Sequence, residues 1–139
     1  MNHNLAKNLA ALSNNSVRVF GDNIPLDAGQ ATAVITFANG TEVRISYWRL
    51  IKDGRAFMSS FDHLQKYGLP APIDAITTLR TELDNSQCTA VQLDGETGDL
   101  ILHFSVKLKL QIFNFTGYEI WEISFPDGTG QYSNYVLSE

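Results

Sequence analysis

The sequence lacks most of the groups that build covalent cross-links, metal sites and nucleotide sites. It has a single cysteine, Cys88, so no disulfide can form within the chain, which fits a reducing cytoplasm. None of its 3 histidines has a cysteine or another histidine at zinc-ligand spacing. Dinucleotide, Walker, serine-hydrolase and zinc-protease motifs are absent too. We therefore expect no metal and no cofactor, and the sequence favours a binding protein over an enzyme without excluding catalysis.

Clustered positive charge and long apolar runs are also missing. The formal net charge is -5, from 10 basic and 15 acidic residues, and no Lys/Arg cluster suited to a nucleic acid stands out. A basic protein partner fits this charge better than a nucleic acid does. No apolar run approaches the ~20 residues of a membrane span. The first residues lack the apolar core of a signal peptide. We expect a cytoplasmic protein that binds neither nucleic acid nor membrane.

What is present is the composition of a soluble globular protein, with 44% apolar and 18% charged residues. The length fits a single domain over residues 1–139. Leu5, Leu9 and Leu12 recur at i, i+4 and i+7, which predicts a short amphipathic helix within residues 1–15. Because so short a helix is unstable alone, it must dock on the domain, as a peripheral element, or on a partner.

Alternating apolar residues predict a hairpin over residues 31–48, with the sequence ATAVITF-ANG-TEVRISYW. A two-residue loop would place Ile35 and Phe37 on the same face as Glu42 and Arg44. A three-residue loop with a left-handed Gly40 places them instead with apolar partners, so we expect that register. The same argument pairs residues 100–104 with 108–112.

Between these hairpins, Pro72 and Asp74 suit the start of the main helix, over about residues 72–84, with Ile76, Leu79 and Leu83 on one face. After the second hairpin, YEIWEISF reads as a central strand, then PDG as a turn and GQYSNYVL as a strand at a sheet edge. The sequence thus predicts an α+β fold: a mostly antiparallel twisted sheet built from hairpins, with the main helix packed on it and a short N-terminal helix.

Candidate polar site residues are few. Asp62 and His63 occupy an irregular segment, and we expect a pocket near them to include Arg49 and Trp121 if the protein binds a small molecule. We favour a structural role for His63, as the third residue of a turn that Ser60 caps, over a functional one. Cys88 is interpreted as a small semi-buried strand residue rather than a nucleophile.

Aromatic residues give the strongest binding signal. Tyr and Trp are enriched at interface hot spots, and Tyr132 and Tyr135 lie in the polar last strand, where exposure is expected. Trp121 is favoured as a core residue. Glu119 and Glu122 are three apart on a strand and so point to opposite faces, which argues against paired carboxylates. Tyr118 and Glu119 remain candidate contact residues.

Two blocks, YGLPAPID and TGDLILHF…LKLQIFNFTGYEIWEISFPDG, carry a family resemblance. They resemble a group of small bacterial proteins of unestablished activity with the pattern TGDLxLxF…GYExWxI. Some members resemble immunity proteins of polymorphic toxin systems, which neutralise a toxin by binding it. The resemblance covers about residues 30–137 and implies a fold and a toxin-like protein partner, but no catalytic residues.

Three functions follow as hypotheses. The first is a cytoplasmic protein-binding module of the immunity type. The second is a small-molecule-binding protein or enzyme with a pocket between sheet and helix. The third is a subunit of a homo-oligomer that uses its N-terminal helix or its last strand.

Overall fold

The computed structural model describes residues 3–21, 31–104, 107–115 and 120–133. They form an α+β fold with a mostly antiparallel sheet, as the sequence predicts. The helices are α1 (His3–Ala10), the 3-10 turn η1 (Ser60–Asp62) and α2 (Ala75–Leu83). The strands are β1 (Asn15–Gly21), β2 (Ala33–Phe37), β3 (Glu42–Ile45), β4 (Trp48–Lys52), β5 (Arg55–Ser59), β6 (Gln87–Leu93), β7 (Leu100–Phe104), β8 (Leu108–Ile112), β9 (Trp121–Ser124) and β10 (Gly130–Tyr132).

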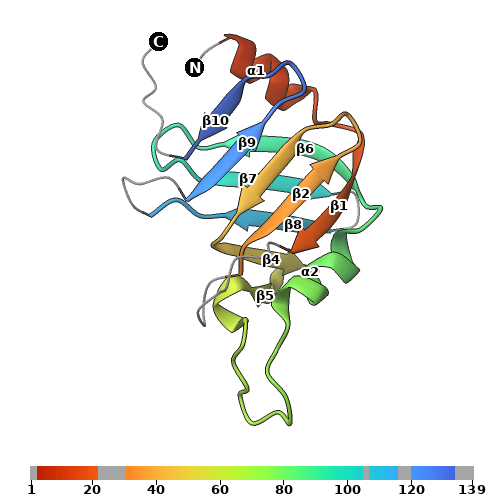
Figure 1. Ribbon diagram of the computed structural model, residues 1–139, viewed down its shortest axis with the longest axis vertical. Helices are drawn as coiled ribbons and strands as arrows, with labels where there is room; N and C mark the ends of the chain where they lie inside the picture. The colour runs from red at the N-terminus through yellow and green to blue at the C-terminus, as the bar shows by residue number, and fades with distance from the viewer. Residues whose placement is uncertain (1–2, 22–30, 105–106, 116–119, 134–139) are drawn as a thin grey trace.

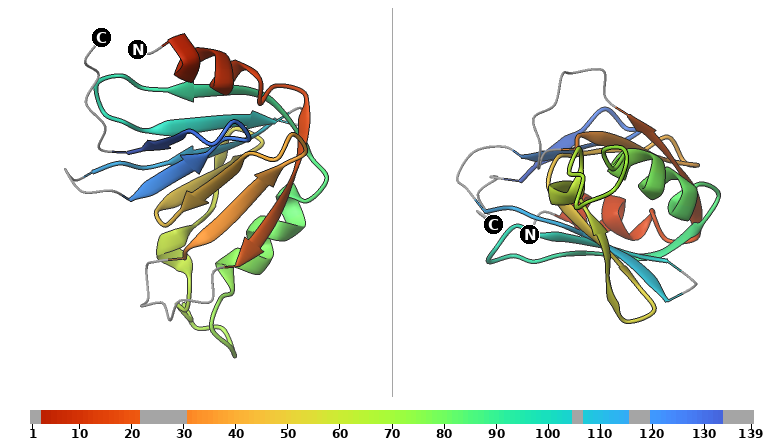
Figure 2. Two further views of the ribbon diagram at one scale, coloured as in Figure 1. Left: turned by 45° about the horizontal axis from the view of Figure 1, so that its top comes forward. Right: turned by 90° about the horizontal axis from the view of Figure 1, so that it is seen from below.

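The described strands form one open sheet in the order β10-β9-β3-β2-β1-β6-β7-β8-β4-β5. The sheet folds over at β1, so that a first half (β10 to β1) and a second half (β6 to β5) face each other as two layers (Figure 2). In Figure 1, α1 lies at one end of these layers and α2 at the other. One continuous apolar core contains buried side chains from both halves.

The fold-over has a local cause in β1. Only Asn15 and Ser16 pair with β6, whereas the rest of β1 pairs with β2. Beyond that point α2 replaces β6 at the edge of β1. The backbone N–H of Val19 donates to Asp84 (2.8 Å), and Nε of Arg80 donates to the carbonyl of Val19 (3.1 Å). Because side chains of the helix satisfy these backbone groups, β1 can leave β6 without losing its hydrogen bonds.

Both hairpins adopt the register expected from their apolar pattern. Ile35 lies opposite Val43 in the first hairpin, and Leu102 lies opposite Leu110 in the second. In the first loop, Gly40 has a left-handed φ of 96° and donates to the carbonyl of Phe37. A left-handed conformation costs least for glycine, so the sequence of the first loop supports this register. Residues 105–106 of the second loop lie outside the described part.

The N-terminal helix is a component of the core rather than a peripheral element. Leu5, Leu9 and Leu12 are at most 5% exposed and belong to the same apolar cluster as the strands. The helix packs beside β6, at one end of the two layers (Figure 1). Burying three leucines contributes roughly 1.5–3 kcal/mol each, which offsets the low stability expected of an isolated eight-residue helix.

The main helix is shorter than expected and begins at Ala75, with Asp74 as its N-cap. The carboxylate of Asp74 accepts from the backbone N–H of Thr77 (3.0 Å). Pro72 therefore lies outside the helix. Ile73 also precedes the helix: its carbonyl accepts from the backbone N–H of Leu64, and its N–H donates to the carbonyl of Gln65. These bonds close the base of a projecting arm, residues 64–73, at the lower end of Figure 1.

The expected cap at Ser60 is wrong by one residue. Ser59 is the N-cap of η1: its hydroxyl accepts from Phe61 N–H (3.2 Å), and Asp62 accepts from Ser59 N–H (2.9 Å). Ser60 is fully buried instead, and its hydroxyl oxygen accepts from the backbone N–H of Trp48 (3.0 Å). His63 consequently follows the turn as its C-cap rather than lying at its third position.

The two tryptophans of the chain join the layers where the chain crosses between them. Trp48 begins β4 in the second half, and its indole N–H donates to the carbonyl of Ala31, just before β2 (2.9 Å). Trp121 begins β9 in the first half, and its indole N–H donates to the carbonyl of Gly98, between β6 and β7 (2.8 Å). Both rings are at most 2% exposed. The expectation that Trp121 is a core residue is thus confirmed.

Candidate functional site

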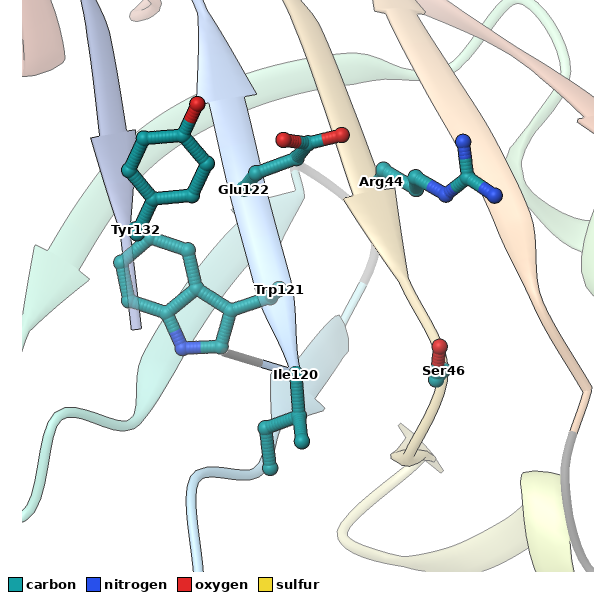
Figure 3. Close-up of a pocket in the computed structure, with 6 residues that line it drawn as sticks. All are labelled: Arg44, Ser46, Ile120, Trp121, Glu122 and Tyr132. Atoms are coloured by element: carbon teal, nitrogen blue, oxygen red, sulfur yellow. The ribbon is translucent and has the colours of Figure 1, made fainter. Parts of the chain in front are cut away.

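The structure does not gather Asp62, His63, Arg49 and Trp121 around one pocket. Trp121 lines a hollow of about 190 Å³ on the first half of the sheet, and none of the other three residues does. The residues that line it are Arg44, Ser46, Ile120, Trp121, Glu122 and Tyr132 (Figure 3). Tyr118, Glu119 and Tyr135 lie outside the described residues.

This hollow lies over a row of cross-strand neighbours. Arg44 of β3 is opposite Glu122 of β9, which is in turn opposite Tyr132 of the edge strand β10. Figure 3 shows Glu122 between the tyrosine ring and Arg44. Tyr132 is 43% exposed, as expected for the last strand. Because pockets for drug-sized ligands are about 300–1,000 Å³, this hollow can hold only a small group.

His63 is a buried structural residue at the start of α2. Its side chain is 7% exposed, and its Nδ1 accepts from the backbone N–H of Ala75 (3.1 Å). The first N–H groups of a helix lack partners within the helix, so the imidazole satisfies one that the N-cap does not. The pKa of Asp74, the N-cap of this helix, is lowered. Burial is the largest influence and opposes the shift, but hydrogen bonds from Thr77 and the nearby His63 outweigh it.

Asp62 organises the segment that follows β5. One carboxylate oxygen closes the turn on Ser59, and the other accepts from the hydroxyl of Tyr67 (2.9 Å). That hydrogen bond is the main reason that the pKa of Tyr67 is raised. Asp62 is thereby committed to holding the arm, rather than free for acid–base chemistry.

Arg49 lies on the outer face of the second half of the sheet, away from His63. Its Nε donates to the side-chain oxygen of Gln111 (2.7 Å), and its guanidinium lies 5.3 Å from the centre of the Phe113 ring. Cation–π contact of this kind and the hydrogen bond to Gln111 hold the guanidinium against the sheet. Arg49 is therefore a surface residue with a fixed position.

Cys88 and the acidic loop after β6 show structural roles. Cys88 is fully buried, and desolvation raises the pKa of its thiol to about 11, which leaves little reactive thiolate near neutrality. Asp94 accepts from the backbone N–H groups of Glu96 and Thr97, which lowers its pKa and shapes the turn. Within residues 3–21, 31–104, 107–115 and 120–133, no cluster of three potential metal ligands occurs.

A feature that the sequence analysis missed is a group of exposed apolar side chains, packed around the half-buried Tyr47, at the end of the molecule that carries η1 and the arm. Tyr47 packs edge-on against Phe115 (ring centres 4.9 Å apart) and against Phe61 (5.8 Å). We call this group the aromatic end; it consists of Tyr47, Phe61, Leu64, Tyr67, Leu69 and Phe115.

The sequence held one signal for the aromatic end. Leu64, Tyr67 and Leu69 lie close together in a stretch rich in turn residues such as Gly68 and Pro70. So irregular a segment cannot direct all three side chains into a core. The contact between Tyr47 and Phe115 could not be predicted from the sequence. These residues are 68 positions apart, and only the order of the strands in the sheet brings them together.

Comparison with protein-family models, curated proteins and solved structures gives no match to this chain. Among the described residues, no helix is both long enough and apolar enough to span a bilayer.

Proposed function

We propose that this chain is a cytoplasmic protein-binding module whose interface is centred on the aromatic end. The observation that carries the proposal is the uneven distribution of exposed apolar groups. Eight large apolar side chains are exposed in the described residues, and five of them belong to this end: Phe61, Leu64, Tyr67, Leu69 and Phe115. Contiguous exposed apolar surface marks interaction sites on soluble proteins, whereas scattered apolar residues do not.

The aromatic end is held in a fixed conformation, as a binding surface should be. Tyr67 is 67% exposed, yet its hydroxyl is bound by Asp62. The base of the arm is closed by two backbone hydrogen bonds between Ile73 and the pair Leu64 and Gln65. Apolar side chains that are already positioned lose little conformational entropy when a partner covers them, so more of the contact energy appears as affinity.

The finer form of the proposal is an inhibitor of the immunity type that binds a toxin-like protein. It is supported by the resemblance of YGLPAPID and TGDLILHF…GYEIWEI to such proteins, and the first of these blocks forms most of the arm. A stable inhibitor complex would bury about 1,600 Å² in total. The partner to test is the protein encoded by the neighbouring gene.

A small-molecule pocket between sheet and helix has less support. Asp62 and His63 are occupied by Tyr67 and Ala75, respectively. The hollow beside Trp121, at about 190 Å³, is smaller than typical ligand pockets. A second hollow, of about 330 Å³, is at the lower end of their range, but no residue of α1, η1 or α2 lines it, so it does not lie between sheet and helix. The geometry therefore favours a protein ligand.

The proposal predicts that Phe61→Ala and Leu69→Ala each weaken binding to the protein encoded by the neighbouring gene. Because truncating an interface hot spot costs about 2 kcal/mol or more, the Kd should rise roughly 30-fold. Isothermal titration calorimetry with the purified pair measures this change.

Phe20→Ala and Phe57→Ala are matched controls. Both phenylalanines are exposed to a similar extent (49% and 46%, against 49% for Phe61) but lie outside the aromatic end. Each also packs against a cation, Arg18 or Lys52, so the loss of a ring contact is comparable. Equal affinities for all four variants, or no binding by the parent chain, would contradict the proposal.

A further inference from the structure

The outer face of the second half of the sheet carries positive charge that the net charge of the protein conceals. Successive outward positions of β7, β8 and β4 form cross-strand neighbours: His103 is opposite Lys109, and Arg49 is opposite Gln111. Lys107 precedes β8 and lines the same hollow as Lys109. We call this surface the basic face; it consists of Arg49, His103, Lys107 and Lys109 with the neutral residues Ile51, Ile101 and Gln111 between them.

The cations of the basic face are not neutralised by the protein. Among the described residues, Arg49, Lys107 and Lys109 form no ion pair with a carboxylate. The two transverse rows through Gln111 and Lys109 contain no acid. Asp53 follows β4, where its backbone N–H donates to the carbonyl of Lys107 (3.0 Å), and Asp99 precedes β7. The first half of the sheet differs, because there Arg44 lies opposite Glu122 and has a partner. Positive charge is therefore concentrated on one layer.

The basic face is also open. The described helices lie at the ends of the two layers, and the right-hand view in Figure 2 shows neither of them on the outer side of β6, β7 and β8. A hollow of about 330 Å³ is lined there by Ile51, His103, Lys107 and Lys109, together with Gly54, Phe104 and Leu108. A partner side chain can thus reach these cations without any movement of the fold.

The basic face is continuous with the aromatic end. The guanidinium of Arg49 lies on Phe113, the backbone N–H of Phe113 donates to the carbonyl of Tyr47 (2.9 Å), and Tyr47 packs on Phe61. An apolar centre beside a charged surface is the usual organisation of a protein interface.

We propose that the basic face binds an acidic surface of the protein partner, next to the aromatic end; this deepens the proposed function and rests on it. Overall charge alone predicts a basic partner. At physiological salt, however, exposed charges more than about 8 Å apart are largely screened. A docked partner therefore responds to the cations that it touches, not to the net charge of -5.

A single-stranded nucleic acid fits this surface less well. Such ligands require aromatic rings on which bases stack. The guanidinium of Arg49 lies over the ring of Phe113, and the exposed rings of Phe61, Tyr67 and Phe115 belong to the aromatic end, beside the cations rather than between them. The aliphatic Ile51 and Ile101 occupy the positions between the cations. Carboxylates can reach the lysines from the side, whereas bases find no aromatic platform between the cations.

The test is NMR mapping with a 15N-labelled sample and an unlabelled oligo-glutamate peptide of about twelve residues as the probe. We expect shifts of backbone amides in β4, β7 and β8, around Arg49, His103 and Lys109, that weaken as salt is added. The double variant Arg49→Gln/Lys109→Gln should raise the Kd of the peptide at least ~5-fold, since close charge pairs contribute more than 1 kcal/mol of coupling. The amide spectrum of each variant also reports whether it is folded.

Lys7→Gln/Arg18→Gln is the matched control, because it removes the same charge from exposed positions on α1 and β1. It should leave the Kd unchanged. Equal losses in both double variants, shifts spread over the whole molecule, or the same shifts with oligo-lysine would overturn the inference. Tighter binding of a twelve-nucleotide single-stranded DNA than of the peptide at equal salt would overturn it as well.

The test separates this inference from the proposed function. Phe61→Ala leaves the basic face intact, so it should retain the peptide shifts while losing affinity for the partner. Peptide shifts at the basic face together with an unaffected partner would mean that the face binds acids but that the aromatic end is not the interface.

Discussion

His63 illustrates how a side chain with an apparent catalytic position can be fully accounted for by structure. It is buried, and its Nδ1 accepts from the backbone N–H of Ala75. His63→Ala leaves that buried N–H without a partner, which should destabilise the protein by about 1–3 kcal/mol. Urea unfolding measures the change.

His103→Ala provides the comparison for this prediction. His103 lies on the outer face of the sheet, where its Nε2 is 2.7 Å from the side-chain oxygen of Gln92. Its removal should change the free energy of unfolding by no more than about 0.5 kcal/mol, as is typical of surface substitutions. Similar losses for the two variants would mean that the hydrogen bond to Ala75 contributes nothing.

At single positions, the sequence predicted burial correctly where apolar and polar residues alternate along a strand. Ile35, Phe37, Leu102 and Phe104 are buried, because a strand turns every second side chain inward. It failed at Ser60, since adjacent serines offer the same hydroxyl and only the extended backbone of Ser59 selects the cap. Such backbone geometry depends on the hydrogen bond that places Ser60 against Trp48.

The N-terminal helix is expected to behave as a core element under mutation. Leu9→Ala should cost about 2–5 kcal/mol, because Leu9 is 5% exposed and its truncation leaves a cavity. Lys7→Ala, two residues away on the exposed side, should cost less than about 0.5 kcal/mol. Chemical denaturation of both variants tests whether the helix is part of the cooperative core. Equal, small effects would show that it is not.

Local elements were predictable from the sequence, whereas their assembly was not. Hairpin registers follow from loop length and apolar spacing within about 18 residues. The helix start was misplaced because Pro72 and Ile73 belong to the arm, through hydrogen bonds to Leu64 and Gln65. The pairings of β3 with β9 and of β4 with β8 join distant segments. These pairings bring Tyr47 to Phe115, which is why the aromatic end was not foreseen.

The two layers of the whole molecule are locked together at Gly98. Its φ is +81°, and a Cβ there would lie 2.6 Å from Nδ2 of Asn114 and 2.9 Å from the backbone oxygen of Ser133. Gly98→Ala must therefore displace backbone of the opposite layer as well as adopt a left-handed conformation. We expect a loss of roughly 2–5 kcal/mol, the sum of both costs.

Gly54→Ala separates these two costs. Gly54 has nearly the same φ, +82°, but no atom within 4 Å of the added Cβ. It should show only the conformational cost of about 1–2 kcal/mol. Free energies from urea unfolding test the difference, and equal values for the two variants would show that the layers are not in close contact at Gly98.

Trp48 and Trp121 give the molecule an intrinsic optical reporter. The chain has no other tryptophan, and each indole bridges from one layer to a backbone carbonyl of the other. Tryptophan fluorescence therefore originates between the two layers, not at the aromatic end. A red shift will signal water entering between the layers, whereas a partner that docks on the arm will leave the emission spectrum nearly unchanged.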